Sequence, residues 1–231
     1  MDFEELKEYL ETHDNYLILT HKSPDGDTLG AGFGLCGYLR EMGKKANVLN
    51  SENFPVRYNF LYDGYYVQEF EPQSVVAVDI ADTQLLGSHL SRFAEEGAID
   101  VCIDHHISNK YYAKRSYVDG KASAACLILY QLFKYIGRPI SNQVAKCLYT
   151  GIATDTGCFK YENTIPQAHI AAAELMQYDI DFSIINRKMF DVKSKGRLIA
   201  EQKVIEGMEY FFEDRCAIIV LTTEMMNSCG V

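Results

Sequence analysis

The stretch 16-YLILTHKSPDGDTLGA-31 decides how the N-terminal part of the chain folds. Residues 16–20 form a short apolar run of the kind that makes a buried strand, and a helical pattern follows at residues 29–43. His21, Asp25 and Asp27 lie between the two, with Pro24 and Gly26 among them. Pro-Asp-Gly favours a tight turn, whereas the three ionisable side chains suit half of a metal site. The D-x-D-x-D-G spacing of a calcium loop is missing.

The rest of the chain alternates strand and helix patterns. Residues 45–50, 74–80 and 98–104 are short apolar runs, and the last two are rich in β-branched residues, as buried parallel strands are. Residues 3–13 and 85–97 have helical periodicity, and the second segment ends at Gly97 and completes a βαβ unit. The pattern is mostly helical from residue 122 onward, and Ser141 is a candidate N-cap. The sequence predicts an α/β fold: a parallel sheet flanked by helices, then a mostly helical segment and a connector helix.

The pattern also predicts the domain organisation. Residues 1–190 form the main domain, and residues 191–213 are more highly charged and read as an exposed helical linker. Residues 214–231 begin with a new strand followed by the start of a helix. So short a segment cannot bury a core of its own, so we expect it to be the beginning of a second, incomplete domain.

Composition limits the class of protein. The chain has 231 residues, 48% of them hydrophobic, and a formal net charge of −10. This charge argues against binding long duplex nucleic acid, but a small phosphorylated substrate remains possible if cations supply the positive charge. No apolar run has membrane-spanning length and the N-terminus is acidic, so we expect no membrane association and a cytoplasmic location. Seven cysteines without C-x-x-C spacing favour buried thiols of a reducing compartment.

Ionisable side chains follow three of the predicted strands. His21, Asp25 and Asp27 follow the first; Asp79 follows the third; Asp104, His105 and His106 follow the fourth. Because parallel strands end at one edge of a sheet, these loops should converge there. Several carboxylates without cations would repel one another and have raised pKa values, and divalent cations remove that penalty.

Asp155 is a further acid of the same kind. It is spaced i, i+4 and i+7 from Leu148 and Ile152 on a predicted helix and therefore shares their apolar face. Each of these ionisable residues alone has an ordinary explanation. Asp79 could cap a helix, the histidines could lie in a solvated turn, and Asp155 could pair with an arginine. One metal site would account for all of them.

The ligand types narrow the choice of metal. Carboxylate and imidazole without thiolate suit manganese, magnesium, iron or zinc. Two histidines and four acids exceed what one ion needs, so two ions are expected. Two metals about 3.5–4 Å apart are the usual arrangement for phosphoester hydrolysis.

The ordered motifs resemble those of the DHH phosphoesterase superfamily. They are HKSPDGD at 21–27, VVAVD ending at Asp79, DHH at 104–106 and GIATDTG around Asp155, and the resemblance covers roughly residues 15–190. PDGDTLGA and ATDTGCF look most like the branch of bifunctional oligoribonucleases and 3′-phosphoadenosine-5′-phosphate phosphatases. The resemblance makes residues 1–190 a DHH catalytic domain and residues 214–231 the opening of a DHHA1 substrate-binding domain. Cys158 stands where many relatives have arginine, and the glycine-rich GGGH-like motif of that second domain is missing.

The family implies a role for each matching residue. His21, Asp25 and Asp79 would bind one metal, and Asp79 would bridge to the second, whose other ligands would be Asp27, His105 and Asp155. Asp104 would orient an imidazole, and His106 would contact the scissile phosphate or its leaving oxygen. The two divalent ions would be Mn²⁺, with Mg²⁺ or another divalent ion as the alternative.

The resemblance predicts a phosphoesterase that hydrolyses small nucleotides. Its substrates would be 3′-phosphoadenosine 5′-phosphate, short oligoribonucleotides or linear dinucleotides, and a homodimer is possible. Two alternatives stay open. One is an inorganic pyrophosphatase of the family-II kind, which shares the layout of the motifs. The other is a non-catalytic module that binds metal and nucleotide, because most of the substrate domain is absent from this sequence.

Overall fold

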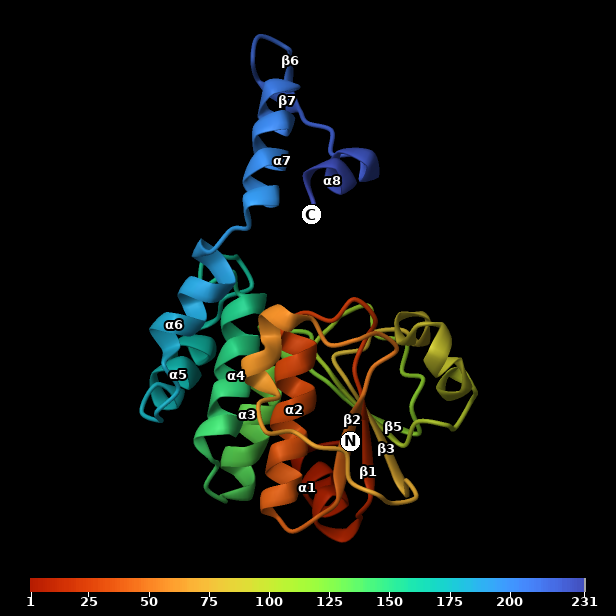
Figure 1. Ribbon diagram of the computed structural model, residues 1–231. Coiled ribbons are helices and arrows are strands. Elements are labelled where there is room, and N and C mark those ends of the chain that lie inside the picture. The colour runs from red at the N-terminus through yellow and green to blue at the C-terminus, as the bar shows by residue number, and fades with distance from the viewer. Residues whose placement is uncertain (231) are drawn as a thin grey trace. The chain divides into compact units, whose positions relative to one another are not determined.

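The computed structural model describes residues 1–230, which divide into two compact units (Figure 1). The first runs from Met1 to Phe190 and the second begins at Asp191. No helix in residues 1–230 is both long and apolar enough to cross a membrane. No disulfide joins any of the seven cysteines, and four of them are buried, as the sequence predicts.

The first unit is built on a five-stranded sheet in which every pair of neighbours is parallel. The strands are β1 (Tyr16–Leu19), β2 (Ala46–Leu49), β3 (Ser74–Val78), β4 (Val101–Asp104) and β5 (Arg115–Val118). Their order in the sheet is β2-β1-β3-β4-β5. The chain therefore moves outward from β1 in one direction to β2 and then in the other direction to β3. Ligands bind at such a reversal of strand order in open parallel sheets, so the β1–β3 boundary is where a site is expected.

Side chains alternate between two hydrophobic layers. Ile18, Val76 and Val101 belong to the large core on the helical side of the sheet. Leu17 and Ala77, their neighbours along the strands, belong to a smaller cluster on the other face. This alternation follows from the two-residue repeat of a strand and buries both faces of the sheet, which confirms the predicted parallel α/β fold.

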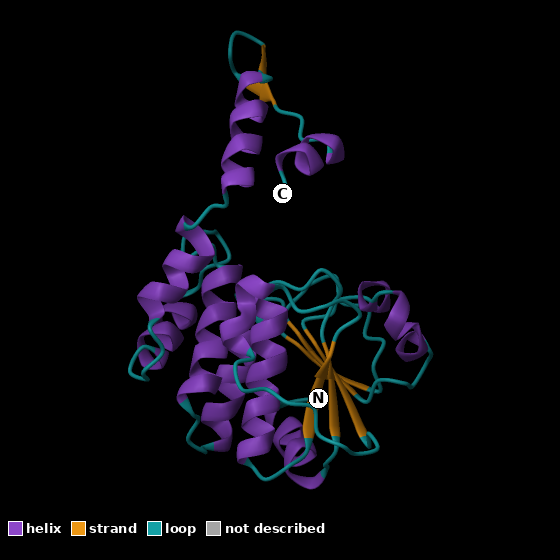
Figure 2. Ribbon diagram, in the orientation of Figure 1, coloured by secondary structure: helices purple, strands orange, loops and turns teal. Residues whose placement is uncertain are grey.

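Helices cover one face of the sheet (Figure 2). In sequence order, those of the first unit are α1 (Phe3–Thr12), α2 (Gly26–Glu41), α3 (Ala125–Ile136), α4 (Asn142–Asp155), α5 (Pro166–Leu175) and α6 (Phe182–Asn186). Ser141 caps α4, as predicted, because its side chain accepts a hydrogen bond from the N–H of Val144. The π-helical segment η4 (Arg187–Asp191) lies at the boundary with the second unit.

The other face of the sheet differs from the prediction. Residues 85–97 were expected to form an α-helix, but the structure has two 3-10 helices there, η2 (Thr83–Leu86) and η3 (Ser88–Ala94). Gly87 separates them with φ of 78°, and a Cβ at this position would lie 2.3 Å from the Ser51 hydroxyl oxygen. Leu86, Leu90 and Phe93 are still buried against the sheet. The predicted apolar spacing is present, but it lies on two short 3-10 helices that meet at Gly87, where the backbone passes close to Ser51.

Two further short elements were not predicted. Edge strand β5 is only partly buried, so its sequence RSYV lacks the apolar pattern of the inner strands. The 3-10 helix η1 (Val56–Leu61) packs against α2 and α4.

The second unit contains α7 (Lys195–Glu206), an antiparallel hairpin of β6 (Glu209–Phe211) and β7 (Cys216–Ile218), and α8 (Thr223–Cys229). Helix α7 matches the expected connector helix and the strand at β7 was expected as well. The helix predicted for residues 191–213 ends earlier than expected, because α7 ends at Glu206 and residues 209–211, which include two aromatic residues, pair as a strand. The division into a catalytic domain, a linker and the start of a second domain stays a prediction.

Glycines on α2 allow it to approach α4 closely. A Cβ at Gly30 would lie 2.5 Å from the carbonyl oxygen of Cys147 in α4. A Cβ at Gly34, one turn further along, would make only ordinary contacts, the shortest being 3.4 Å to the Cys147 side chain. The bare backbone at Gly30 therefore sets the distance between the helices that carry Asp27 and Asp155.

We predict that Gly30→Ala lowers the free energy of unfolding by about 1–3 kcal/mol, because backbone atoms cannot yield to the added methyl group. The matched variant Gly34→Ala should be neutral or stabilising by up to about 1 kcal/mol, because alanine is the better helix former. Urea unfolding followed by circular dichroism measures both. Equal effects of the two substitutions would contradict this account of the helix contact.

Candidate metal centre

The loops after β1, β3 and β4 meet at one edge of the sheet, as their sequence predicts. They bring the predicted site residues together with Asp155 at the end of α4, and three groups of their side chains could each hold a metal ion. The groups are His21, Asp25 and Asp79; Asp27, His105 and Asp155; and Asp79, His105 and His106. Asp79 and His105 each belong to two groups, so the groups form one continuous cluster. The eighth predicted residue, Asp104, lies behind the cluster.

The loop after β1 is both a turn and part of the cluster. Ser23 has φ of 52°, and Asp25 then caps α2 by accepting hydrogen bonds from the N–H groups of Asp27 (3.0 Å) and Thr28 (3.1 Å). The cap fixes the Asp25 carboxylate 3.7 Å from Nε2 of His21. The segment HKSPDGD is therefore a turn and also contributes side chains to the cluster.

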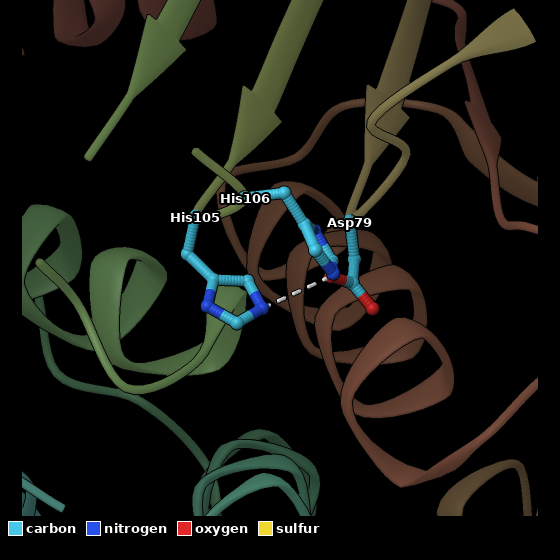
Figure 3. A group of neighbouring side chains, drawn as sticks. All are labelled: Asp79, His105 and His106. Carbon is cyan, nitrogen blue, oxygen red and sulfur yellow. Dashed lines mark ion pairs between the residues drawn. The ribbon is translucent and has the colours of Figure 1, made fainter. Parts of the chain in front are cut away.

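Asp79 lies at the centre of the cluster. Its carboxylate is buried, with Oδ2 3.6 Å from Nε2 of His21 and Oδ1 3.5 Å from Nε2 of His105. Figure 3 shows His105 and His106 directed toward this carboxylate. Asp79 has φ of 58° and caps no helix, which excludes the ordinary explanation of its position. A residue in this left-handed conformation is held there by its surroundings, which is common at functional sites.

His21 and His105 are each oriented by a backbone carbonyl. Nδ1 of His21 lies 2.7 Å from the carbonyl oxygen of Lys22, and Nδ1 of His105 lies 3.2 Å from that of Ala122. A neutral imidazole that donates from Nδ1 presents the lone pair of Nε2 on its other side. In both residues that side faces the carboxylates, which is the orientation a metal ligand needs.

Asp27 is held by a helix that lies far from it in sequence. Its Oδ1 accepts from the N–H of Cys126 (2.9 Å) and its Oδ2 from that of Ala125 (2.6 Å), at the start of α3. The α3 N-cap residue, Ala124, offers no side-chain cap, so Asp27 supplies one. A Cβ at Gly151 would lie 2.6 Å from Oδ1 of Asp27, so α4 must carry glycine there. The remaining side of the Asp27 carboxylate faces His105 Nε2 at 3.8 Å.

Asp155 completes this side of the cluster from the last turn of α4. Its Oδ2 lies 3.5 Å from Nε2 of His105. The Asp155 carbonyl oxygen accepts a hydrogen bond from the Asn163 side chain at 3.1 Å. This bond joins the end of α4 to the loop that follows.

Asp104 orients His106 and does not face the other carboxylates. It is fully buried, and its Oδ1 lies 2.8 Å from Nδ1 of His106 and accepts the N–H of His105. Its Oδ2 accepts a hydrogen bond of 2.6 Å from the Asn109 side chain. With Nδ1 engaged in this way, Nε2 is the other ring nitrogen of the partly exposed His106 side chain.

The described cluster fits a metal on two grounds. Within residues 1–230, Oδ1 of Asp79 and Nε2 of His105 are buried without a hydrogen-bond partner, and an unpaired buried polar atom is costly. In addition, metal–ligand bonds of about 2.0–2.2 Å place two ligands of one ion roughly 3–4 Å apart, which is the range of the imidazole–carboxylate distances here.

The pKa shifts report the same excess of negative charge. Burial and the nearby Asp79 and Asp155 carboxylates raise the pKa of Asp27 well above its ordinary value. Burial, together with Asp79, raises the pKa of Asp155 to about 6. A divalent cation would offset this repulsion and keep both groups ionised.

The imidazoles shift for the complementary reason. Burial lowers the pKa of His21, but Asp25 and Asp79 outweigh it and raise the pKa to about 10. For His105, burial is likewise outweighed by Asp79, Asp27 and Asp155, and the pKa rises to about 10. In the absence of metal, protons therefore take the place of cations in the cluster.

A parallel α/β fold with carboxylates and imidazoles at its strand reversal defines a class of metal-dependent hydrolases. Comparison with known proteins identifies the family of this chain. The DHH family, N-terminal domain, matches residues 15–152, which is more than half of the chain. The chain therefore belongs to the DHH family of phosphoesterases, and the resemblance drawn from the motifs is confirmed.

Two curated relatives show which members of the DHH family this chain resembles. A protein of Streptococcus mutans named as a probable bifunctional oligoribonuclease and PAP phosphatase NrnA is 28% identical over 91% of this chain and 74% of its own length. The bifunctional oligoribonuclease and PAP phosphatase NrnA of Thermus thermophilus is 30% identical over 80% of this chain. The match covers 56% of the T. thermophilus protein, so this chain spans little more than half of that relative.

A solved structure supports the same fold. The crystal structure of an exopolyphosphatase-related protein from Bacteroides fragilis has a TM-score of 0.86 and 26% identity. The match covers 99% of this chain and 71% of the other.

The sequence did not single out two residues that support the site. Asn109 holds Asp104, and Asn163 holds the backbone of Asp155. Asn109 follows the Asp-His-His run closely, and this proximity was its only signal in the sequence. Asn163 had no such signal, because its contact depends on how the loop after α4 turns back.

We predict that metal binding releases protons. At pH 8 the metal-free protein should hold protonated His21 and His105, whose pKa values lie near 10, and the metal-binding form of each is neutral. Titration with Mn²⁺ in buffers of different ionisation enthalpy should therefore show release of up to about two protons. Histidines with an ordinary pKa of about 6.5 would release almost none at pH 8, and that result would contradict the shifts.

Proposed function

We propose that this chain carries the catalytic centre of a two-metal phosphoesterase that hydrolyses small nucleotides. The observation that carries the proposal is the Asp79 carboxylate, which has one oxygen toward His21 and the other toward His105. A carboxylate in this position suits a ligand shared by two ions. His21, Asp25 and Asp79 would form one metal site, and Asp27, Asp79, His105 and Asp155 the other.

When bound, two divalent ions supply neutralisation of the phosphate charge and activation of water. Manganese is the proposed metal, and a site of mixed carboxylate and imidazole accepts it. The residues of the chain fix where this chemistry takes place. Asp25 and Asp27 are held by helix N-termini, and the two imidazoles are oriented by backbone carbonyls.

His106 has a separate role in the proposal. Its side chain is 43% exposed, so a substrate can reach it more easily than it can reach the buried ligands. The hydrogen bond that His106 donates to the Asp104 carboxylate raises the pKa of His106, although burial opposes this. A cationic His106 would bind the scissile phosphate or its leaving oxygen, with Nε2 as the donor.

The proposed substrates are supported by the activities for which the relatives are named and by the charge of the chain. The relatives are named for oligoribonucleotides and PAP, and both substrates are small phosphate esters. The net charge of −10 disfavours a long nucleic-acid groove. We therefore propose 3′-phosphoadenosine 5′-phosphate, short oligoribonucleotides or linear dinucleotides.

The central test is Asp79→Asn, which keeps the shape of the side chain and removes its charge. Removal of a residue that hydrogen-bonds to a metal ligand typically lowers metal affinity or activity about 10–100-fold. Removal of a ligand shared by two ions should therefore lower kcat/KM by at least about 100-fold. The assay follows Mn²⁺-dependent release of phosphate from 3′-phosphoadenosine 5′-phosphate and of mononucleotides from a short oligoribonucleotide.

Asp82→Asn is the matched control, because Asp82 follows the same strand and caps η2 through Gln84 without joining the cluster. It should keep the activity of the unchanged protein. An Asp79→Asn variant with full activity would contradict the two-metal proposal. Faster turnover of inorganic pyrophosphate than of any nucleotide would instead favour the pyrophosphatase alternative.

A second prediction separates Asp104 from the metal ligands. Asp104→Asn removes the charge that holds His106 and leaves the side chains of the proposed metal ligands unchanged. We expect kcat to fall about 10–100-fold while the affinity for Mn²⁺ changes little. Steady-state kinetics and metal calorimetry measure the two quantities. A loss of metal affinity as large as that of Asp79→Asn would make Asp104 part of the metal centre.

A further inference from the structure

The loop after Asp155 has an unusual backbone. Gly157, Cys158 and Phe159 follow one another with φ of 57°, 57° and 63°, and the left-handed region is unfavourable for the two that carry side chains. The N–H groups of Lys160 and Tyr161 both donate to the carbonyl oxygen of Thr156. The ring of Phe159 stacks on His169 at 5.1 Å. Packing and hydrogen bonds therefore hold this tight turn in place.

The turn positions the ring of Tyr161 against Gly157. A Cβ at Gly157 would lie 2.4 Å from Cε1 and Cζ of that ring, so the ring rests on bare backbone two residues after Asp155. Any other residue would displace the ring and would also be strained at this φ. This contact ties the position of the ring to the segment that begins at Asp155, a proposed metal ligand.

The other end of the loop is tied to the same centre. Asn163 donates to the carbonyl oxygens of Asp155 (3.1 Å) and Ser123 (3.2 Å). Ser123 directly follows Ala122, whose carbonyl oxygen orients His105. The segment that carries Tyr161 is thus anchored to the backbone of one proposed ligand, Asp155, and to Ser123, which follows the residue that orients His105.

Most of the Tyr161 side chain is exposed to solvent. Within residues 1–230 its hydroxyl makes no hydrogen bond, its ring stacks on no other ring, and the residue is 62% exposed. An aromatic ring held in a fixed position with an open surface is suited to stacking, because little freedom is lost when a ligand binds. Nucleobases stack on such rings whatever their sequence.

We infer that Tyr161 is one wall of a nucleobase subsite next to the metal centre. The inference rests on the proposed function, since the phosphate of the same ligand would occupy the metal centre. Because Tyr161 lies on the loop beside Asp155, the base would be held on the Asp155 side of the phosphate. A stacking wall explains why the chain accepts a strained turn and an exposed aromatic ring at this point.

The test compares substrates with and without a base. Tyr161→Ala should raise KM for deoxyadenosine 3′,5′-bisphosphate about 5- to 100-fold, the range that a base–aromatic stack supports. The kcat value should stay within about twofold, and Tyr161→Phe should keep the low KM because its ring remains. The abasic deoxyribose 3,5-bisphosphate should be hydrolysed equally by all three proteins.

Tyr66→Ala is the matched control. Tyr66 is as exposed as Tyr161, but its ring lies against Arg40 near the far end of α2. It should leave the KM for both substrates unchanged. An equal loss with both substrates in Tyr161→Ala, or no loss with the adenine substrate, would overturn the inference.

A binding measurement keeps the inference separate from catalysis. The chain contains no tryptophan, so the fluorescence of 2-aminopurine riboside 3′,5′-bisphosphate can be followed in the presence of Mg²⁺. Binding to the unchanged protein should quench it, and Tyr161→Ala should weaken binding about 5- to 100-fold and abolish the quenching. Quenched binding with Mg²⁺, together with no turnover of the same ligand when Mn²⁺ is supplied, would refute the phosphoesterase proposal and leave the subsite standing. An absence of binding, or equal quenching by Tyr161→Ala, would refute the subsite.

Discussion

The burial of Asp79 between two imidazoles is the constraint on which the rest of the site depends. Taking a carboxylate out of water costs several kcal/mol unless something replaces its hydration. Two other buried acids obtain that replacement from the protein: Asp27 from the N-terminus of α3, and Asp104 from His106 and Asn109. Within residues 1–230, Oδ1 of Asp79 obtains no hydrogen bond. The fold thus leaves one buried charge whose compensation must come from a bound cation or from protonated histidines.

The same carboxylates build the fold and the site. Asp25 starts α2 and Asp27 caps α3, so two helices point their N-termini toward the cluster through acids that also face histidines. The helix dipole stabilises negative charge at those positions. Each acid therefore has one side fixed by backbone N–H groups and the other side available to a cation. This arrangement holds the ligands in position without further side chains.

Much of this could be predicted from the sequence, because its signals are local. Uniformly apolar, β-branched runs marked the inner strands, and ionisable residues directly after them marked the site. The cap that Asp27 gives to α3 joins residues about a hundred positions apart and left no local trace. The break at Gly87 depends on Ser51, and edge strand β5 is too exposed to show an apolar pattern. The sequence therefore gives no local signal for a contact such as the Asp27 cap or the Ser51–Gly87 approach, nor for a strand that is not buried.

Exposure within the cluster indicates the side from which a substrate reaches it. The side chains of Asp27 and Asp79 are only 1% and 3% exposed, whereas those of Asp155 and Asp25 are 27% and 54% exposed. A phosphate must therefore approach past Asp25 and Asp155, on the side where His106 is also exposed. The approach is lined by acids, so an anionic ligand would be repelled unless cations were already in place. In the proposed function, metal would therefore bind before substrate.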